Sequence, residues 1–171
     1  WEMGAFHFVQ LHNDSDYEVP EAQICSALSW LKHDLHDAFL RDKRIVINLH
    51  KPQVQSLIPV LEGYEYNVVG IFYGHHHAYV GYDGDLVVGA IRIPRFYSGS
   101  VQWNLFSLAR FDADRLTVTA IDSSTGAPVH HATAAAYDNV GAGAHVADPF
   151  TYVFPTHDCP AGRAPVGEDG A

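Results

Sequence analysis

The chain is 171 residues long, and 47% of its residues are hydrophobic, which is enough apolar material for one globular domain with a buried core. Its formal net charge of -10 excludes a general attraction to nucleic acid phosphates or to anionic lipid surfaces. The twelve histidines are the unusual feature of the composition. Because imidazole binds divalent transition metals near neutral pH, these histidines raise the hypothesis of a metal site.

The cysteines and the apolar runs leave the cellular compartment open. Cys25 and Cys159 have no CxxC spacing, which argues against a structural zinc site or a thioredoxin-type redox pair. One long-range disulfide and two free thiols both remain compatible with the sequence. No apolar run approaches the roughly 20 residues needed to cross a bilayer, and the first residues lack the pattern of a signal peptide. We therefore expect a soluble chain without a membrane span.

Predicted strands and helices alternate in the first half of the chain. A β-rich run at 6–11 predicts a strand, and the polar residues 12–16 predict the loop that follows it. An amphipathic helix is predicted from apolar residues at helical spacing, namely Ile24, Leu28, Leu31, Leu35 and Phe39. The runs 44–49 and 67–73 are typical of buried strands, with a second helix predicted at about 53–61 between them.

Helical periodicity is absent from the second half, which predicts a β-rich region. The expected strands are 78–82, 86–93, 103–111 and 115–121. Hairpin turns are predicted at Asp83-Gly84 and at 112–114. We interpret residues 1–131 as one α/β domain, and residues 132–171 as an irregular extension that packs on it with one short strand from the aromatic patch 150–154.

Histidines follow both of the predicted buried strands. His50 comes directly after the first, and His75 and His77 come after the second. Because ligands of open α/β sheets bind beyond the carboxyl ends of parallel strands, we expect these three imidazoles to converge at one edge. In His75-x-His77 the two rings can face adjacent metal positions, and Gly74 is expected to permit the tight exit from the strand.

The two histidine motifs resemble those of a known family. A buried strand ending in H-x-P (His50-Lys51-Pro52), followed by one ending in G-H-x-H (Gly74-His75-His76-His77), is similar to the C-terminal half of calcineurin-like metallophosphoesterase domains. The opening Trp1 to Asn13 also resembles a strand of secreted bacterial members, which favours an extracytoplasmic location. The resemblance covers roughly 1–126.

The resemblance implies a fold and a site. The fold would be part of a four-layer α/β/β/α sandwich with mixed sheets. In the dinuclear site that it implies, His50 and His75 bind one metal and His77 binds the other. Zinc, manganese and iron all suit histidine-rich coordination, and the two ions would activate water to hydrolyse a phosphomonoester or phosphodiester.

The upstream motifs of such enzymes are missing from this chain. D-x-H, G-D-x-x-D and G-N-H-[DE], which supply the carboxylate and asparagine ligands, do not occur in it. Three readings stay open: a phosphoesterase site completed by a missing N-terminal half on another polypeptide, a catalytically inactive binding module that associates with itself or a partner, and a mononuclear metal site. The substrate and the oligomeric state are equally open.

Further polar residues are candidates near this edge. His12, Asn13 and His76 are possible substrate contacts, although ordinary loop hydrogen bonding also explains His12 and Asn13, and solvent exposure also explains His76. We expect the remaining histidines, among them His7, His33 and His36, to be solvated surface residues.

Overall fold

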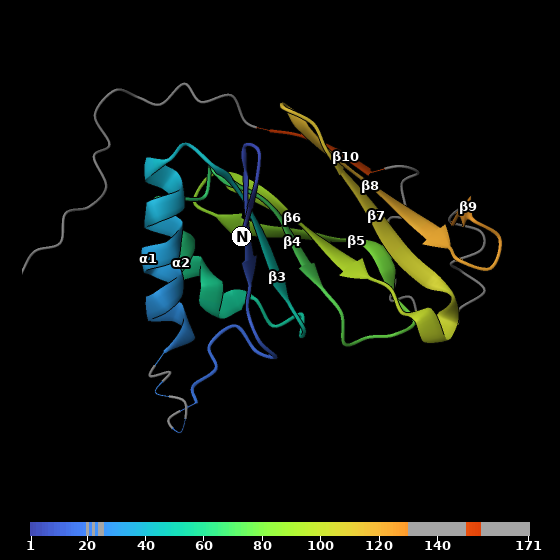
Figure 1. Ribbon diagram of the computed structural model, residues 1–171, viewed down its shortest axis with the longest axis horizontal. Coiled ribbons are helices and arrows are strands. Elements are labelled where there is room, and N and C mark those ends of the chain that lie inside the picture. The colour runs from blue at the N-terminus through green and yellow to red at the C-terminus, as the bar shows by residue number, and fades with distance from the viewer. Residues whose placement is uncertain (20, 22, 24–25, 130–149, 155–171) are drawn as a thin grey trace, which may run out of the picture.

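A computed structural model describes residues 1–19, 21, 23, 26–129 and 150–154 of the chain. In this part of the chain, two β-sheets pack face to face and helices cover the other face of the first sheet (Figure 1). The mixed α/β class expected from the sequence is confirmed.

The first sheet has six strands and creates the edge on which the histidines lie. Its spatial order is β1 (Glu2–Met3), β2 (Phe6–Gln10), β3 (Arg44–Leu49), β4 (Val68–Tyr73), β6 (Ile91–Ser98) and β5 (Val80–Val88). Strands β2, β3, β4 and β6 are parallel, whereas β1 and β5 run antiparallel to their neighbours. The sheet is therefore mixed, and the carboxyl ends of four strands share one edge.

Helices cover one face of this sheet. They are α1 (Ala27–Leu40), the 3-10 helix η2 (Gln55–Leu57) and the short α2 (Ile58–Leu61). The Ser26 hydroxyl caps α1 by accepting a hydrogen bond from the Ser29 backbone N–H at 3.3 Å. Leu31 and Leu35 are fully buried in a core with strand residues such as Ile47, which confirms the predicted apolar stripe. Residue 24, its first member, lies outside the described residues.

The second predicted helix lies where the sequence predicted it, but only part of it is α-helical. The segment predicted at about 53–61 begins as a 3-10 turn, and only its last four residues are α-helical. No helix in the described part of the chain has the length and apolar character required to cross a bilayer.

The second sheet is antiparallel. It contains β10 (Phe150–Val153), β8 (Arg115–Asp122) and β7 (Leu105–Phe111) in that order, with β9 (Ala127–Pro128) also paired to β8. Strand β10 is the short strand expected from the aromatic patch, and Phe154 directly after it is buried. The other residues of the predicted extension lie outside the described residues, as do Cys25 and Cys159. Trp103, predicted as the start of a strand, instead ends the 3-10 helix η3 (Val101–Trp103).

A second core joins the two sheets. Aromatic residues of the first sheet, including Phe8, Phe72 and Phe96, pack on Leu116 and Val118 of β8. Within the described residues the order of layers is helices, sheet, sheet. The fourth, helical layer implied by the family resemblance stays a prediction.

The predicted turn at Asp83-Gly84 is wrong. Both residues lie inside β5, which has a register shift between Tyr82 and Asp85, and the chain reverses between Val88 and Ile91 instead. The aspartates that suggested a turn are instead hydrogen-bonded to tyrosines: Asp83 accepts a hydrogen bond from Tyr73, and Asp85 accepts one from Tyr82. The turn predicted at 112–114 does connect β7 to β8.

Candidate metal centre

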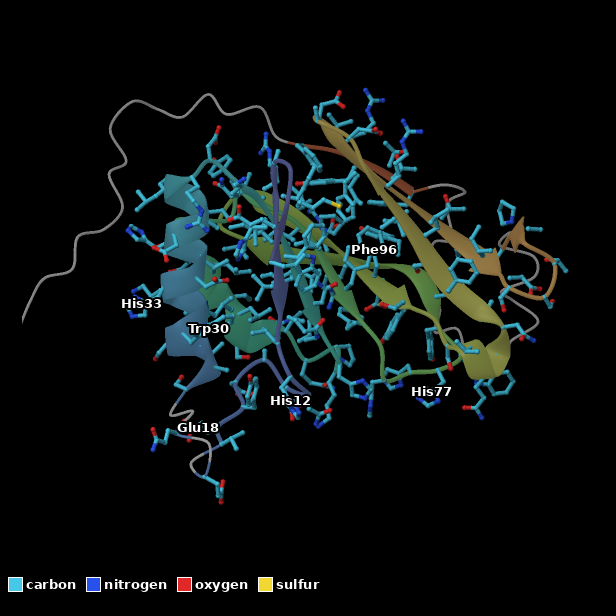
Figure 2. The ribbon with its side chains drawn as sticks, viewed as in Figure 1. His12, Glu18, Trp30, His33, His77 and Phe96 are labelled. Atoms are coloured by element: carbon cyan, nitrogen blue, oxygen red, sulfur yellow. The ribbon has the colours of Figure 1, made fainter. Side chains whose placement is uncertain are left out.

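Backbone hydrogen bonds beyond the strand ends bring three loops side by side. The His50 N–H donates to the His12 carbonyl at 3.1 Å, and the Gly74 N–H donates to the His50 carbonyl at 3.0 Å. Parallel pairing thus continues past the carboxyl ends of β2, β3 and β4 for one or two residues. Figure 2 shows His12 and His77 on the same lower edge of the molecule. The predicted site residues consequently share one edge of the sheet.

His50 and His75 are in contact at this edge. The His50 Nε2 and the His75 Nδ1 are 3.3 Å apart, and their ring planes are inclined by 82°. Two imidazole nitrogens bound to one tetrahedral zinc ion at about 2.0–2.1 Å lie about 3.3 Å apart. The spacing of this pair therefore suits two ligands of a single ion, and in the absence of metal it suits a hydrogen bond in which one ring is the donor.

The electrostatic surroundings of His75 favour its neutral form. Desolvation at the strand end, followed by the charges of His76 and His50, lowers the pKa of the His75 imidazole. Lys51 acts in the same direction. Because only the neutral ring can bind a metal, this lowering favours metal binding near neutral pH.

The backbone at His75 is strained. His75 has a φ of 68°, in the left-handed region that side chains other than glycine rarely adopt. The expectation that Gly74 would provide the tight exit from the strand is wrong, since Gly74 is not among the described residues with positive φ. The turn is made by the histidine itself, whose conformation aims its ring at His50.

The third predicted ligand has a different partner. The His77 Nδ1 is 3.2 Å from the Oε1 of Gln102, which belongs to η3. Gly99 makes the approach of η3 possible: its φ is 83°, and a Cβ there would lie 2.6 Å from the Leu105 carbonyl oxygen. The structure thus brings two of the three predicted histidines together. In the described residues, no three histidine, cysteine, aspartate or glutamate side chains are grouped to hold a metal.

The predicted substrate residues surround the pair. The His76 ring is exposed and packs edge-on against Tyr79 and Tyr97, with ring centroids 5.6 and 5.7 Å away. On the other side, the His12 ring lies 5.1 Å from that of Tyr17. The Asn13 side chain donates to Asp14 at 3.2 Å. These contacts fit both ordinary loop packing and a rim around a bound substrate.

Lys51 is a cation at this edge that sequence reasoning missed. Its backbone N–H donates to the Asn13 carbonyl, and its Nζ lies 3.0 Å from an Asp14 carboxylate oxygen. Because Lys51 occupies the variable position of the H-x-P motif, the motif gave no signal for it. Lys51 could have been identified from its position next to His50, because a chain with a net charge of -10 needs a local cation to attract phosphate.

The two sheets enclose a cleft of about 260 Å³ that no sequence pattern predicted. Its lining comes from five strands and the N-terminal residue, and includes Trp1, Phe8, Asn48, Phe72, Ser107 and Phe111. Phe8, Phe72 and Phe111 are far apart in the chain. Phe111 of β7 meets the aromatic residues of the first sheet only because the two sheets pack face to face.

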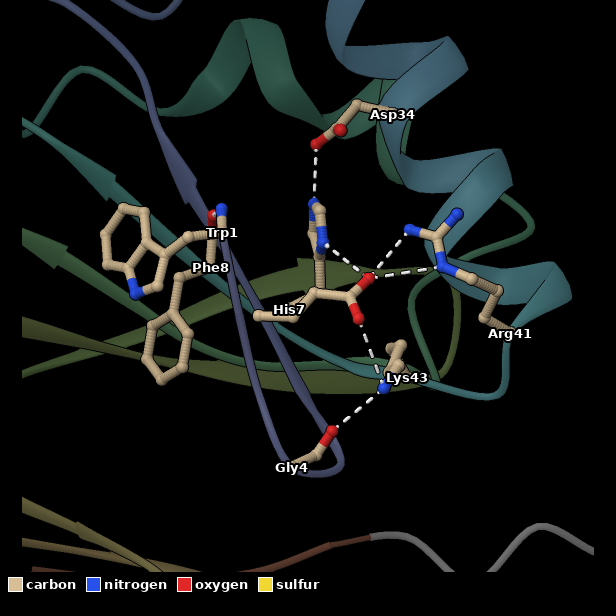
Figure 3. A network of polar contacts seen from close by, with 8 residues as sticks. Trp1, Gly4, His7, Phe8, Asp34, Arg41 and Lys43 are labelled. Atoms are coloured by element: carbon tan, nitrogen blue, oxygen red, sulfur yellow. Dashed lines mark hydrogen bonds and ion pairs between the residues drawn. The ribbon is translucent and has the colours of Figure 1, made fainter.

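His7 is not the solvated residue that we expected. It is 6% exposed, and its Nε2 lies 2.8 Å from the Asp34 carboxylate of α1. The His7 Nδ1 also lies 3.6 Å from a Glu2 carboxylate oxygen, and Glu2 extends the network, with the Arg41 Nη2 2.9 Å and the Lys43 Nζ 3.3 Å from its oxygens. Figure 3 shows His7, Asp34, Arg41 and Lys43 in this network. The network fastens the β1–β2 hairpin to the helical layer, so His7 has a structural explanation.

The two other histidines of α1 differ from each other. His33 is exposed, as expected, and Figure 2 shows it on the outer side of the helix. His36 is half-buried, and its Nδ1 lies 3.3 Å from the Tyr64 hydroxyl. Neither contacts the histidines at the sheet edge in the interactions described.

Comparison with protein-family models and with curated proteins finds no match to this chain. The site must therefore be judged on its own geometry.

Proposed function

We propose that this chain supplies the histidine part of a metal-dependent phosphoesterase site. His50 and His75 would hold one divalent zinc, manganese or iron ion, and His77 would hold a second after leaving Gln102. The observation that carries the proposal is the 3.3 Å separation of the His50 and His75 ring nitrogens at the carboxyl edge of parallel strands. When bound, the metals would polarise the phosphate and lower the pKa of a coordinated water.

The chain's own residues would bind and orient the phosphate ester. Lys51 follows His50 in the chain and has a partly exposed side chain, so it would attract the phosphate after leaving Asp14. His76 would contact the ester group, since its ring is exposed and is held in place by edge-on packing against the Tyr79 and Tyr97 rings. His12 and Asn13 would form the opposite rim, because their carbonyls already bind the His50 and Lys51 N–H groups.

The proposal requires ligands from outside this chain's sequence. Two imidazoles leave a divalent ion without the carboxylates that would neutralise a metal pair. The proposal therefore includes a partner segment with the D-x-H, G-D-x-x-D and G-N-H-[DE] motifs, the four-layer sandwich that this segment would complete, and the extracytoplasmic location suggested by the resemblance.

Metal titration of the chain tests the ligand assignment. We expect calorimetry to detect one zinc site that is lost in His50→Ala and in His75→Ala. His33→Ala is the matched control, because His33 is equally exposed but lies on the helix. Equal zinc binding by His75→Ala and His33→Ala would refute the role of His75.

Hydrolysis tests the reaction. With zinc, manganese or iron, we expect the chain to hydrolyse bis-p-nitrophenyl phosphate only after a segment with the three upstream motifs has been added. His75→Ala should then abolish hydrolysis while the circular dichroism spectrum stays unchanged. A restored protein with no phosphodiesterase or phosphomonoesterase activity would leave the binding module as the better explanation.

The noncatalytic binding module is the second candidate, and a specific observation favours it. Phe106 and Leu108, which are two residues apart on one face of β7, are both exposed apolar side chains. Exposed apolar groups that lie close together are typical of surfaces that bind another polypeptide.

A further inference from the structure

One of the sheet edges in the described residues lacks the features that keep strands from pairing with other chains. Strand β1 has two residues, β10 has four, and β5 contains a register shift flanked by aspartates. Short length, bulges and charge all protect an edge from further pairing. The edge strand β7 is different, because its seven residues form an uninterrupted ladder with β8 from Leu105 to Phe111.

The composition of β7 offers little further protection. Its sequence, LFSLARF, contains neither proline nor lysine. Its single charged residue, Arg110, is held by Asp112 with an Nη2–Oδ1 distance of 3.1 Å. Because β8 pairs with one side of β7 only, alternate N–H and C=O groups of β7 point away from the sheet. The Leu105 N–H already donates to the Ser100 carbonyl at 3.0 Å. In the described part of the chain, the outward groups of Ser107, Ala109 and Phe111 are therefore the ones that could bind the backbone of an added strand.

Apolar surface lies on both sides of this edge. On the outer face, Phe106 is 40% and Leu108 is 58% exposed. On the inner face, Ala109 and Phe111 form a wall of the 260 Å³ cleft. An engineered cavity of about 150 Å³ is large enough for benzene, so this cleft has room for more than one aliphatic side chain. An added strand with apolar residues could cover both surfaces, because its side chains alternate between the two faces.

We propose that the free edge of β7 binds an extended peptide segment of a partner protein by strand addition. The segment would carry apolar residues directed into the cleft. It would have basic ends, because a chain with a net charge of -10 attracts cations and repels a second copy of itself. The proposal does not depend on a metal or on the phosphoesterase reaction.

A synthetic probe tests the proposal with the whole chain in the presence of a chelator. The probe is a fluorescein-labelled peptide of alternating threonine and valine with a lysine at each end, and its binding is followed by fluorescence anisotropy. Methylating alternate backbone nitrogens on the edge that faces β7 should weaken binding roughly tenfold, because that edge can then no longer donate to β7. The control peptide is methylated on the edge that faces away from β7, and we expect it to bind as tightly as the unmethylated peptide.

Protein variants locate the site. Leu108→Lys should weaken binding roughly tenfold, since lysine is a typical protecting residue of edge strands. Val87→Lys is the matched control, because Val87 is a 49% exposed aliphatic residue on the other edge strand, β5, and we expect unchanged binding. Circular dichroism establishes that both variants are folded.

Three results would overturn the proposal. They are equal binding of both methylated peptides, equal loss of binding in the two lysine variants, and a dimer in sedimentation that Leu108→Lys dissociates. The last would show that a second copy of the chain occupies the edge.

Discussion

The strained backbone of His75 predicts that substitution by glycine changes the free energy of unfolding in opposite directions at His75 and at His76. The left-handed conformation costs a residue with a side chain about 1–2 kcal/mol, and histidine is among the residues that tolerate it best. Replacement by glycine removes this cost and loses an exposed hydrogen bond to His50, worth about 0.5 kcal/mol. Glycine also has more backbone entropy in the unfolded state, which costs about 0.5 kcal/mol. His75→Gly should therefore raise the free energy of unfolding by roughly 0.5 kcal/mol.

The same change at the next residue should have the opposite effect. His76 is equally exposed but does not have a positive φ, so His76→Gly should lower the free energy of unfolding by about 0.5–1 kcal/mol. With a urea dependence of roughly 2 kcal/mol per molar, the midpoints of the two variants should differ by about 0.5–1 M.

Urea unfolding with a chelator, followed by circular dichroism, measures both variants. A shift in the same direction for both would refute the argument that strain is concentrated at His75. Repeating the titration with zinc adds a functional readout, because a metal that binds only the folded state raises its stability. We expect zinc to raise the midpoint of the wild-type chain and to leave that of His75→Gly unchanged.

The other predictions concern the core and the alkaline limit of stability. Gly70→Ala should lower the free energy of unfolding by about 1–2 kcal/mol in urea titrations, because its Cβ would lie 3.0 Å from the fully buried Leu116 side chain. Gly74→Ala has no such close contact and should leave the free energy of unfolding nearly unchanged. Equal losses of stability in the two variants would contradict this prediction. Burial, assisted by the Asp83 carboxylate, raises the pKa of Tyr97 from 10 to about 12. The folded state therefore keeps this phenol protonated where the unfolded state ionises, so stability present below pH 10 is lost between pH 10 and 12. Tyr97→Phe should reduce that loss in thermal unfolding scans, and an unchanged pH profile would count against the assignment.

Much of the fold could be predicted from local sequence. Leu31 and Leu35 predicted the buried face of α1, and the β-branched run 44–49 predicted β3, because both patterns reflect burial within a single element. The error at Asp83 has a physical reason. Its carboxylate binds Tyr73 of another strand, a contact that turn propensities cannot contain.

The site was predicted in part. The motifs identified His50 and His75, and parallel strand order explains why they meet. The contact between His77 and Gln102 depends on where η3 packs, and that position depends on Gly99 and Leu105. The two-metal reading and the phosphoesterase reaction stay predictions.

The sequence by itself determined helix α1 and the buried strands β3 and β4, and that histidines follow these two neighbouring strands. These properties depend on side-chain periodicity and on the residues at strand ends, which are local. Only the tertiary structure decided the left-handed turn at His75, the burial of His7 against Asp34, and the cleft beside β7. Each of these depends on distances between residues far apart in the chain, which are set by how the two sheets and the helices pack together.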